Sequence, residues 1–330
     1  MLCPGTRHRS RTRRHRLSCD SRALGRTSVT QPRFALVLGG GAALGYAHLG
    51  VLDVFEQEGL MPDLICGTSM GALAGASVLA WSGAGEAIRR FRVALDDPWV
   101  MNLDFSYLRK QAGESFWDLF FGRVRKGLLV TQSMIRDSIV GPDSYDRILR
   151  NLIPDEAIEE LRRPFACIST NLMSPQPRTL WRSGSLMQAV AASCAIPGIF
   201  PAQTIDGEVH VDGGSIENIP VPAARELGAT FVVAVSVDQE EPVGPKGVAA
   251  EYFIAASHLA RRRLTELQIA DADAVLYPNL RQFHWADFQA LGDIVEAGRR
   301  IARASVADIR RAWGEHQKQY RKGWRRWRHQ

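Results

Sequence analysis

The sequence lacks the features that mark several common classes of protein. Its five cysteines include no C-x-x-C pair and show no regular spacing, which argues against a disulfide framework and a zinc site. Two uncharged stretches, residues 64–85 and 183–205, have the length of a membrane span. Glycine and hydroxyl residues interrupt the first stretch, however, and two prolines interrupt the second. We therefore expect a reduced, cytosolic protein with no bound metal and no transmembrane helix.

The two ends of the chain lack other features. Residues 1–33 have no apolar core of a secretory signal, and residues 317–330 contain no acid. The first segment has nine arginines and one aspartate, a net charge of +8, and the last carries +6. Within a total of +6, residues 34–316 therefore carry about −8. Because the positive charge lies at the ends, the pI of about 9.3 does not indicate a nucleic-acid-binding fold. Residues 1–33 have the composition of an organelle transit peptide, and they could also result from a start codon assigned too early. We expect a disordered basic tail.

A glycine-rich stretch, Gly39–Gly45 (GGGAALG), lies between an apolar run of strand length, Phe34–Leu38, and a helical pattern, Tyr46–Glu58. It does not have the G-x-G-x-x-G spacing of a dinucleotide fold, and it has no G-K-[ST] of a phosphate loop. We therefore expect no nucleotide cofactor. A run of backbone N–H groups at a helix N-terminus remains. Such a run suits any anion, including a carbonyl oxygen that gains charge during acyl transfer.

The stretch Ile65–Gly75 (ICGTSMGALAG) contains Gly67, Ser69 and Gly71 in a G-x-S-x-G pattern. In a nucleophile elbow this pattern marks a strained strand-to-helix turn that exposes a serine oxygen. The chain is rich enough in glycine for the pattern to arise by chance about one time in ten. The motif therefore needs a proton acceptor and an anion site elsewhere in the chain.

The proton acceptor has two kinds of candidate. None of the eight histidines lies in a stretch that resembles a catalytic loop, and His210 and His284 are the two that a conventional Ser-His-Asp triad would use. The other candidate is Asp212, which ends a predicted strand in GEVHVDGG, where Gly213 and Gly214 allow a sharp turn. The same D-G pair is also a hairpin signal, and His210 shares a strand face with Asp212. These residues alone leave both candidates open.

The order of the predicted elements is that of an α/β fold with a mainly parallel sheet, in one domain over residues 34–316. The predicted strands cover residues 34–38, 64–66, 165–169, 209–212, 230–237 and 274–277. The predicted helices cover residues 46–58, 70–81, 85–95, 133–139, 155–162, 186–192, 221–227, 251–270 and 291–313. An aromatic cluster at Phe116, Trp117, Phe120 and Phe121 is either a lid over a cleft or, as we prefer, part of a packed helical insert.

The glycine loop, the G-x-S-x-G stretch and the D-G-G stretch, in that order, resemble the patatin-like phospholipase family, especially its bacterial members and the catalytic domain of neuropathy target esterase. The resemblance covers about residues 34–238. Four segments carry it: LVLGGGAALGYAHLGVLDVFEQEG, MPDLICGTSMGALAGA, AVAASCAIPGIFPAQTIDGEVHVDGGSIENIPV and ARELGATFVVAVSVD. It implies a three-layer α/β/α fold and calcium-independent hydrolysis of lipid acyl esters by a Ser–Asp dyad, without histidine and without a cofactor.

Carried onto this chain, the resemblance implies that Ser69 is the nucleophile and Asp212 the base. It also implies that Gly40, Gly41 and Ala42 supply the N–H donors of an oxyanion hole. The supporting glycines of the three motifs are Gly39, Gly45, Gly67, Gly71, Gly213 and Gly214. The sequence departs from the family at Leu44, where Arg or Lys usually precedes the last glycine of the loop. This departure leaves the rate and the preference for phosphate-bearing substrates open.

We therefore expect a serine lipid acyl hydrolase of the phospholipase or lysophospholipase type, cytoplasmic or peripheral to a membrane, with a lipid ester as substrate and no nucleic-acid partner. Two alternatives remain: a conventional esterase that uses His210 or His284, and a catalytically weak member that binds lipid or protein. The segment Tyr320–Arg328 (YRKGWRRWR) interleaves Trp324 and Trp327 with cations. Its composition suits either a peripheral anchor on an anionic membrane or an inert solvated tail.

Overall fold

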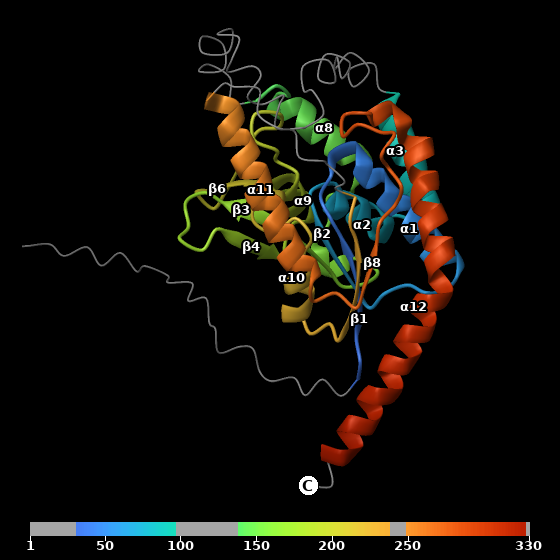
Figure 1. Ribbon diagram of the computed structural model, residues 1–330. Helices are drawn as coiled ribbons and strands as arrows, with labels where there is room; N and C mark the ends of the chain where they lie inside the picture. Colours follow the sequence, from blue (N-terminus) through green and yellow to red (C-terminus); the bar gives the residue numbers. More distant parts are fainter. Residues whose placement is uncertain (1–30, 97–137, 238–248, 328–330) are drawn as a thin grey trace, which may run out of the picture. The chain divides into compact units, whose positions relative to one another are not determined.

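The computed structural model describes residues 31–96, 138–237 and 249–327. These residues form an α/β fold around one eight-stranded sheet (Figure 1). The strand order is β5-β6-β3-β2-β1-β7-β8, and β4 pairs with β3 off this path. The strands are β1 (Phe34–Leu38), β2 (Leu64–Thr68), β3 (Phe165–Asn171), β4 (Arg178–Trp181), β5 (Gln203–Ile205), β6 (Glu208–Asp212), β7 (Phe231–Val235) and β8 (Ala274–Leu276).

Helices connect these strands, and three of the short connections that matter below are 3-10 turns. The helices are α1 (Tyr46–Gln57), α2 (Met70–Ala80), α3 (Ala84–Leu95), α8 (Pro142–Leu152), α9 (Leu186–Ser193), α10 (Val221–Glu226), α11 (Ala249–Ile269) and α12 (Leu291–Trp327). The 3-10 turns are η1 (Ala42–Gly45), η2 (Ile158–Glu160) and η3 (Gly213–Ser215).

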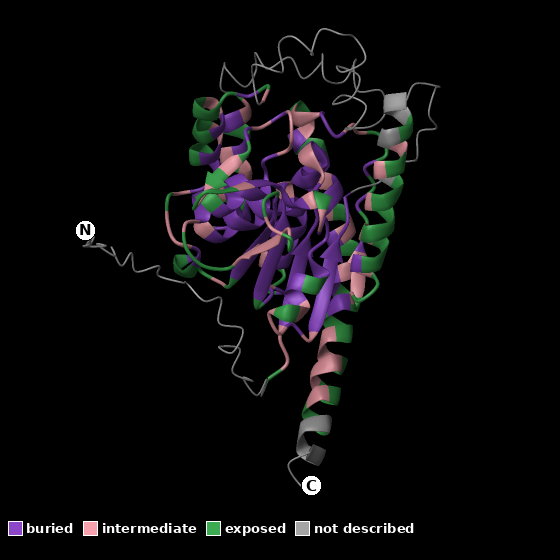
Figure 2. Cartoon of the chain, turned by 90° about the vertical axis from the view of Figure 1, so that its left-hand side faces the viewer, coloured by how far each residue is buried: buried purple, intermediate pink, exposed green. Residues whose placement is uncertain are grey.

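The centre of the sheet is parallel and buried on both faces. Strands β1, β2, β3, β7 and β8 run parallel to their neighbours in this group. Leu36 and Leu38 of β1 pack into a large apolar cluster with α1, α2 and α12, whereas Ala35 and Val37 pack into a smaller cluster with α10. Figure 2 shows the resulting burial of the sheet. Continuous apolar runs therefore form a mainly parallel sheet, as the sequence predicted, within the three-layer α/β/α fold that the family resemblance implied.

The longest helix, α12, packs closely along α1. A Cβ on Gly298 would lie 2.0 Å from the carbonyl oxygen of Ala47, and a Cβ on Gly50 would lie 2.0 Å from that of Val295. Two glycines, one on each helix, thus let the two backbones touch. This packing fixes α1, the helix that follows the glycine loop.

Several predicted elements differ from the structure. The predicted helix 155–162 is only the turn η2, because Ala157 bridges to Ser185 and holds its backbone extended. Helix α8 was not predicted, and neither were β4 and β5, which are short and only partly buried. Helix α12 continues past Trp313 to Trp327, so the expected C-terminal tail begins inside a helix.

Three expectations concern residues outside those that the structure describes. One is the expected basic N-terminal tail, of which residues 1–30 lie there. The aromatic cluster at Phe116, Trp117, Phe120 and Phe121 lies there entirely, as do residues 133–137 of the predicted helix 133–139. The next residue, Ser138, forms an isolated bridge with Gly198 and is not helical. Within the described ranges, no helix is both long enough and apolar enough to cross a bilayer.

Candidate active site

Ser69 lies in the turn between β2 and α2, with φ 53° and ψ −126°. A positive φ is uncommon for a residue with a side chain and is typical of a nucleophile elbow. The turn leaves no room for a Cβ at either flanking glycine. A Cβ on Gly71 would lie 2.2 Å from the carbonyl oxygen of Leu38, and one on Gly67 would lie 2.5 Å from the backbone N of Ala72. The G-x-S-x-G pattern is therefore a steric requirement of this turn.

Asp212 reaches the neighbourhood of Ser69 through the pairing of β3. Strand β4 pairs with residues 167–170 along one edge of β3. Strand β2 pairs with residues 165–168 and β6 pairs with residues 169–171, so both ranges overlap the range of β4. Because two strands cannot pair with the same residues along one edge, β2 and β6 lie together on the opposite edge. Thr68 pairs with Ile168, and Asp212 pairs with the next residue, Ser169. Because β2 is parallel and β6 antiparallel to β3, the carboxyl ends of β2 and β6 meet there.

The D-G-G stretch is not the hairpin turn that its sequence also allowed. The hairpin between β5 and β6 turns at Asp206 and Gly207, with φ values of 53° and 83°. Asp212 instead caps η3, where its Oδ1 accepts a hydrogen bond from the Gly214 N–H at 2.7 Å. A Cβ on Gly213 would lie 2.3 Å from the carbonyl oxygen of Ile168, so this glycine lets the turn pass against β3.

The carboxyl group of Asp212 is buried, and burial raises its pKa to about 6. The Ser69 side chain, the Gly214 N–H and the positive charge of Arg261 all lower this pKa, but they do not offset the desolvation. The second oxygen, Oδ2, is buried and has no hydrogen bond of regular geometry to the described residues. Asp212 is therefore a carboxylate whose proton affinity is raised and whose free oxygen is available to the serine.

The glycine loop offers two of the three expected N–H donors. The Gly40 N–H donates to the carbonyl oxygen of Asn218 at 3.1 Å, so the expectation that it serves the oxyanion hole is not met in this structure. The N–H groups of Gly41 and Ala42, at the start of η1, have no acceptor among the described residues. They are two of the unpaired donors that every helix N-terminus leaves. Of the three expected amides, the described structure therefore leaves those of Gly41 and Ala42 able to donate to an anion.

A buried histidine holds the start of this loop. Nε2 of His48 lies 2.7 Å from the carbonyl oxygen of Gly39, and burial lowers the pKa of His48 to about 4. The ring is therefore neutral near pH 7 and donates from Nε2. At the other end of the loop, a Cβ on Gly45 would lie 2.4 Å from Cγ of Met70. The loop is thus fixed from both ends, and His48 has a structural role.

Neither histidine of the alternative triad lines the cavity that contains Ser69. Nδ1 of His210 lies 3.1 Å from the hydroxyl of Ser169, and its ring packs edge-on against Trp181. Nδ1 of His284 accepts a hydrogen bond from the Ala286 N–H at 3.2 Å. The arrangement of the described residues therefore favours Asp212 over both.

The cavity between these elements has a volume of about 90 Å³. It brings together Ser69, Asp212 and the loop amides with four apolar residues and one cation, Arg261 of α11. The apolar members of its wall are Leu44, Ile196, Pro197 and Trp285. The described ranges contain no group of three or more His, Cys, Asp or Glu side chains that could hold a metal ion. The arrangement combines a strained serine, a buried carboxylate and main-chain donors in a largely apolar space.

Asn218 is a site residue that sequence reasoning did not identify. It is buried and lines the cavity, and its carboxamide lies between the glycine loop and the D-G-G turn. A Cβ on Gly40 would come within 2.6 Å of its Oδ1, and a Cβ on Gly214 within 3.1 Å. Its Nδ2 is buried without a partner in the described structure. The only signal in the sequence was its position six residues after Asp212.

Comparison with known proteins gives three findings. A family model described as patatin-like phospholipase matches residues 36–225, more than half of the chain. Patatin-like phospholipase domain-containing protein 6 of Homo sapiens is 31% identical over 215 residues, which are 64% of this chain and 14% of that protein. An uncharacterized NTE family protein of Mycobacterium tuberculosis is 31% identical over 217 residues, which are 66% of this chain and 52% of that protein.

The matches thus span about half or less of these relatives. The crystal structure of VipD from Legionella pneumophila aligns with a TM-score of 0.40 at 16% identity, over 84% of this chain and 67% of that one. The match to the family model covers the glycine loop, the elbow and the D-G-G turn. The chain therefore belongs to the patatin-like phospholipase family.

Proposed function

We propose that the protein is a serine acyl hydrolase that cleaves carboxylic esters of lipids, with Ser69 as nucleophile and Asp212 as base. The observation that carries the proposal is the shared cavity of a strained serine, a buried carboxylate and the amides of Gly41 and Ala42, which have no acceptor in the part of the chain that the structure describes. Membership of the family supports lipid ester hydrolysis in general. Because the matches span only part of the relatives, the substrate and the whole protein's activity belong to the proposal.

The proposed reaction has two steps with one covalent intermediate. In the first step, Oγ of Ser69 attacks the ester carbonyl, and its proton passes to the carboxylate of Asp212. The N–H groups of Gly41 and Ala42 stabilise the tetrahedral oxyanion. Its collapse breaks the C–O bond, and the leaving alcohol takes the proton from Asp212. In the second step, water gives a proton to Asp212 and attacks the acyl-serine. The acid is released as the proton returns to Ser69.

The raised pKa of Asp212 supports its role as the base. A carboxylate with an ordinary pKa near 4 is a weak base for an alcohol, and proton transfer becomes easier as the pKa rises toward the operating pH. Burial raises the pKa of Asp212 to about 6, so it remains mostly ionised near pH 7 while holding a proton more tightly than an exposed aspartate.

The walls of the cavity favour a lipid ester that carries a phosphate group. Leu44 and Trp285 provide apolar surface for an acyl chain, and Arg261 supplies a cation from α11. Leu44 occupies the loop position where the family usually has a basic residue. We propose that Arg261 provides the positive charge for the substrate's phosphate group in place of that residue. We also propose that Nδ2 of Asn218 donates a hydrogen bond to a substrate oxygen.

Labelling with a fluorophosphonate probe tests the proposed function. Such probes react with activated serines, so the wild-type protein is expected to become labelled on Ser69, and the Ser69→Ala variant is expected to remain unlabelled. Peptide mass mapping identifies the modified residue. Absence of labelling in a folded protein would contradict the enzymatic proposal and favour the alternative of a lipid- or protein-binding member.

A further inference from the structure

A second cavity lies at the amino end of the parallel strands, away from Ser69. It has a volume of about 320 Å³, and Leu64 and Phe165, the first residues of β2 and β3, form part of its wall. Ser69 follows the opposite end of β2. None of the residues that line this cavity lines the candidate active site. The two cavities are therefore separate sites at opposite ends of the sheet.

The second cavity is strongly basic. Four arginines line it, Arg33, Arg162, Arg163 and Arg182, against a single acid, Glu159. Glu159 is exposed, and its Oε2 accepts a hydrogen bond from a backbone N–H, that of Gly184, at 2.9 Å. None of the four arginines forms an ion pair with a described residue. The positive charge of this cavity is therefore not neutralised within the described chain.

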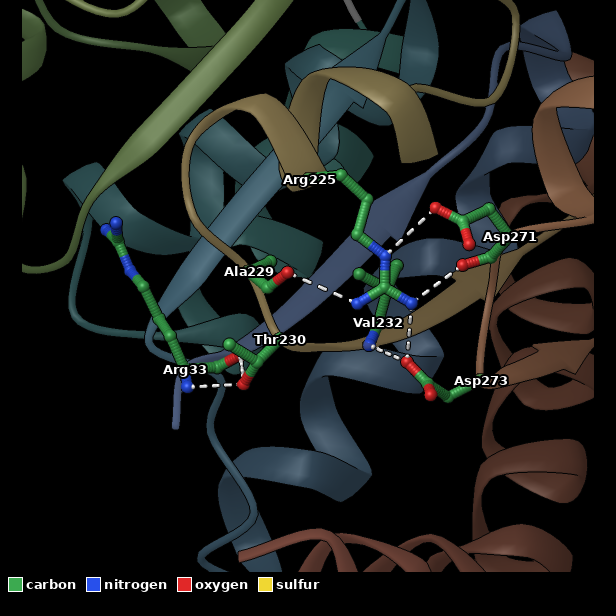
Figure 3. A network of polar contacts seen from close by, with 7 residues as sticks. All are labelled: Arg33, Arg225, Ala229, Thr230, Val232, Asp271 and Asp273. Atoms are coloured by element: carbon green, nitrogen blue, oxygen red, sulfur yellow. Dashed lines mark hydrogen bonds and ion pairs between the residues drawn. The ribbon is translucent and has the colours of Figure 1, made fainter. Parts of the chain in front are cut away.

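The contrast with a neighbouring arginine is visible in Figure 3. Arg225 forms ion pairs with Asp271 at 3.3 Å and with Asp273 at 2.8 Å, so acids match its charge. The guanidinium group of Arg33 points away from this network. Its Nη1 donates instead to the carbonyl oxygen of Leu227 at 2.8 Å. Arg225 is thus paired with two acids, whereas Arg33, at the same end of the sheet, forms no ion pair with a described residue.

Backbone carbonyls hold the cavity arginines in position. Arg162 donates from Nε to the carbonyl oxygen of Leu79 at 3.0 Å, and Arg163 donates from Nη1 to that of Pro62 at 3.3 Å. A carbonyl group restrains a guanidinium without cancelling its charge. Arg182 is exposed and has no polar partner among the described residues. Three of the four guanidinium groups are thus held in place, and arginine is the side chain that binds phosphate in a bidentate geometry.

We infer that this cavity binds a soluble small molecule with a multiply charged phosphate group. The cavity has space for such a group and charge to hold it, and apolar residues such as Ile158 and Leu161 would contact an attached organic body. Phosphate could also come from a lipid headgroup. A bilayer that presents an ester to Ser69 would face the carboxyl end of the sheet, however, and we therefore assign the cavity to a soluble ligand. A bilayer bound by the end of α12, beyond Trp313, would lie at the amino end instead, and the vesicle arm of the test distinguishes the two sources.

The test uses pyrophosphate as the probe and the full-length protein. Isothermal titration calorimetry at low ionic strength is expected to show saturable binding that weakens as salt is added. Arg182→Ala and the double variant Arg163→Ala/Arg182→Ala are expected to raise the Kd by at least about tenfold, because each removes charge-assisted hydrogen bonds. Arg147→Ala is the matched control, since Arg147 is an exposed arginine of α8 that does not line the cavity.

Two outcomes would overturn the inference. One is a failure of the direct binding test: pyrophosphate shows no saturable binding to the wild type, or its binding is weakened as much by Arg147→Ala as by Arg182→Ala. The other is that sedimentation with phosphatidic acid vesicles depends on Arg182 whereas pyrophosphate does not bind, which would assign the cavity to a membrane. Unchanged melting temperatures of the variants without ligand exclude a folding defect. Because Ser69 is not involved, failure of this inference leaves the proposed function untouched.

Discussion

Ser69 and Asp212 lie at the carboxyl ends of two strands, β2 and β6, that meet along one edge of β3. Neighbouring residues of β3, Ile168 and Ser169, pair with Thr68 and Asp212. Strand β3 therefore sets the separation of the serine and the carboxylate, although the two residues are 143 positions apart in the sequence. A site built on paired strands is rigid, which suits the catalytic pair that we propose.

We predict that Ser69→Ala and Asp212→Asn each reduce ester hydrolysis by at least about 1,000-fold, because each removes one partner of the proton transfer. Initial rates with a short-chain p-nitrophenyl ester and with a lysophospholipid measure the effect. His210→Gln and His284→Gln serve as controls and are expected to keep most of the activity. A histidine variant as inactive as Asp212→Asn would support the conventional triad instead.

The raised pKa of Asp212 predicts that activity depends on pH. The base must be ionised, so kcat/KM is expected to fall as the pH drops through about 6, the pKa of this carboxyl group. A pH–rate profile between pH 4.5 and about 8.5 would check this limb. A profile that falls only near pH 4 would show that the carboxyl group that controls the rate is not desolvated.

The same burial predicts that Asp212 destabilises the fold. Its folded pKa of about 6 exceeds the ordinary value of 3.8. Above pH 6 the group is ionised in both states, and its burial costs about 3 kcal/mol, at 1.36 kcal/mol for each pKa unit. This cost disappears as the pH falls from 6 toward 4. Denaturant unfolding should therefore show Asp212→Asn as more stable than the wild type at pH 8 and little different at pH 4. Equal stability at pH 8 would contradict the assigned desolvation.

Asn218 is predicted to contribute a hydrogen bond to substrate. Asn218→Ala removes the unpartnered Nδ2 and is expected to lower kcat/KM by about 10- to 100-fold, without moving the acid limb of the pH profile. Asn218→Asp places a second carboxyl group in the cavity, which should raise the pKa of Asp212 and move that limb to higher pH. An Asn218→Ala variant with wild-type kinetics would show that Asn218 has only a packing role.

Arg261 is predicted to distinguish phosphate-bearing substrates from neutral ones. Arg261→Gln should lower kcat/KM for a lysophospholipid by about 10- to 100-fold, since a hydrogen bond to a charged group is lost. The rate with a neutral p-nitrophenyl ester should change much less. The ratio of the two rates is the measurement. An equal loss with both substrates would mean that Arg261 acts on the site in general and not on the phosphate.

The end of α12 is predicted to bind anionic membranes. Exchange of Arg325, Arg326 and Arg328 for glutamine removes half of the cations of residues 317–330. The affinity for phosphatidylserine vesicles, measured by co-sedimentation, should then fall by about 100-fold, because each basic residue near the surface contributes about 1 kcal/mol. Vesicles of neutral lipid provide the control. Unchanged binding to both kinds of vesicle would leave this segment as a solvated helix end.

Part of this molecule could be predicted from local sequence. Apolar runs without charges identified the parallel strands, because a polar side chain on a strand that is covered on both faces costs free energy when it is buried. The glycines at 67 and 71 identified the elbow, because a Cβ cannot fit there. Strands β4 and β5 escaped prediction because they are short and half exposed, so no hydrophobic period marks them.

The sequence by itself thus determined the layers of the fold and the residue types available for chemistry, because strands, turns and helices depend on neighbours in the chain. Only the tertiary structure decided how these residues are used. It paired the Gly40 N–H with Asn218, left the N–H groups of Gly41 and Ala42 without an acceptor among the described residues, and brought Arg261 to the cavity. Contacts between residues that are far apart in sequence follow from the packing of whole elements, and no local pattern records them.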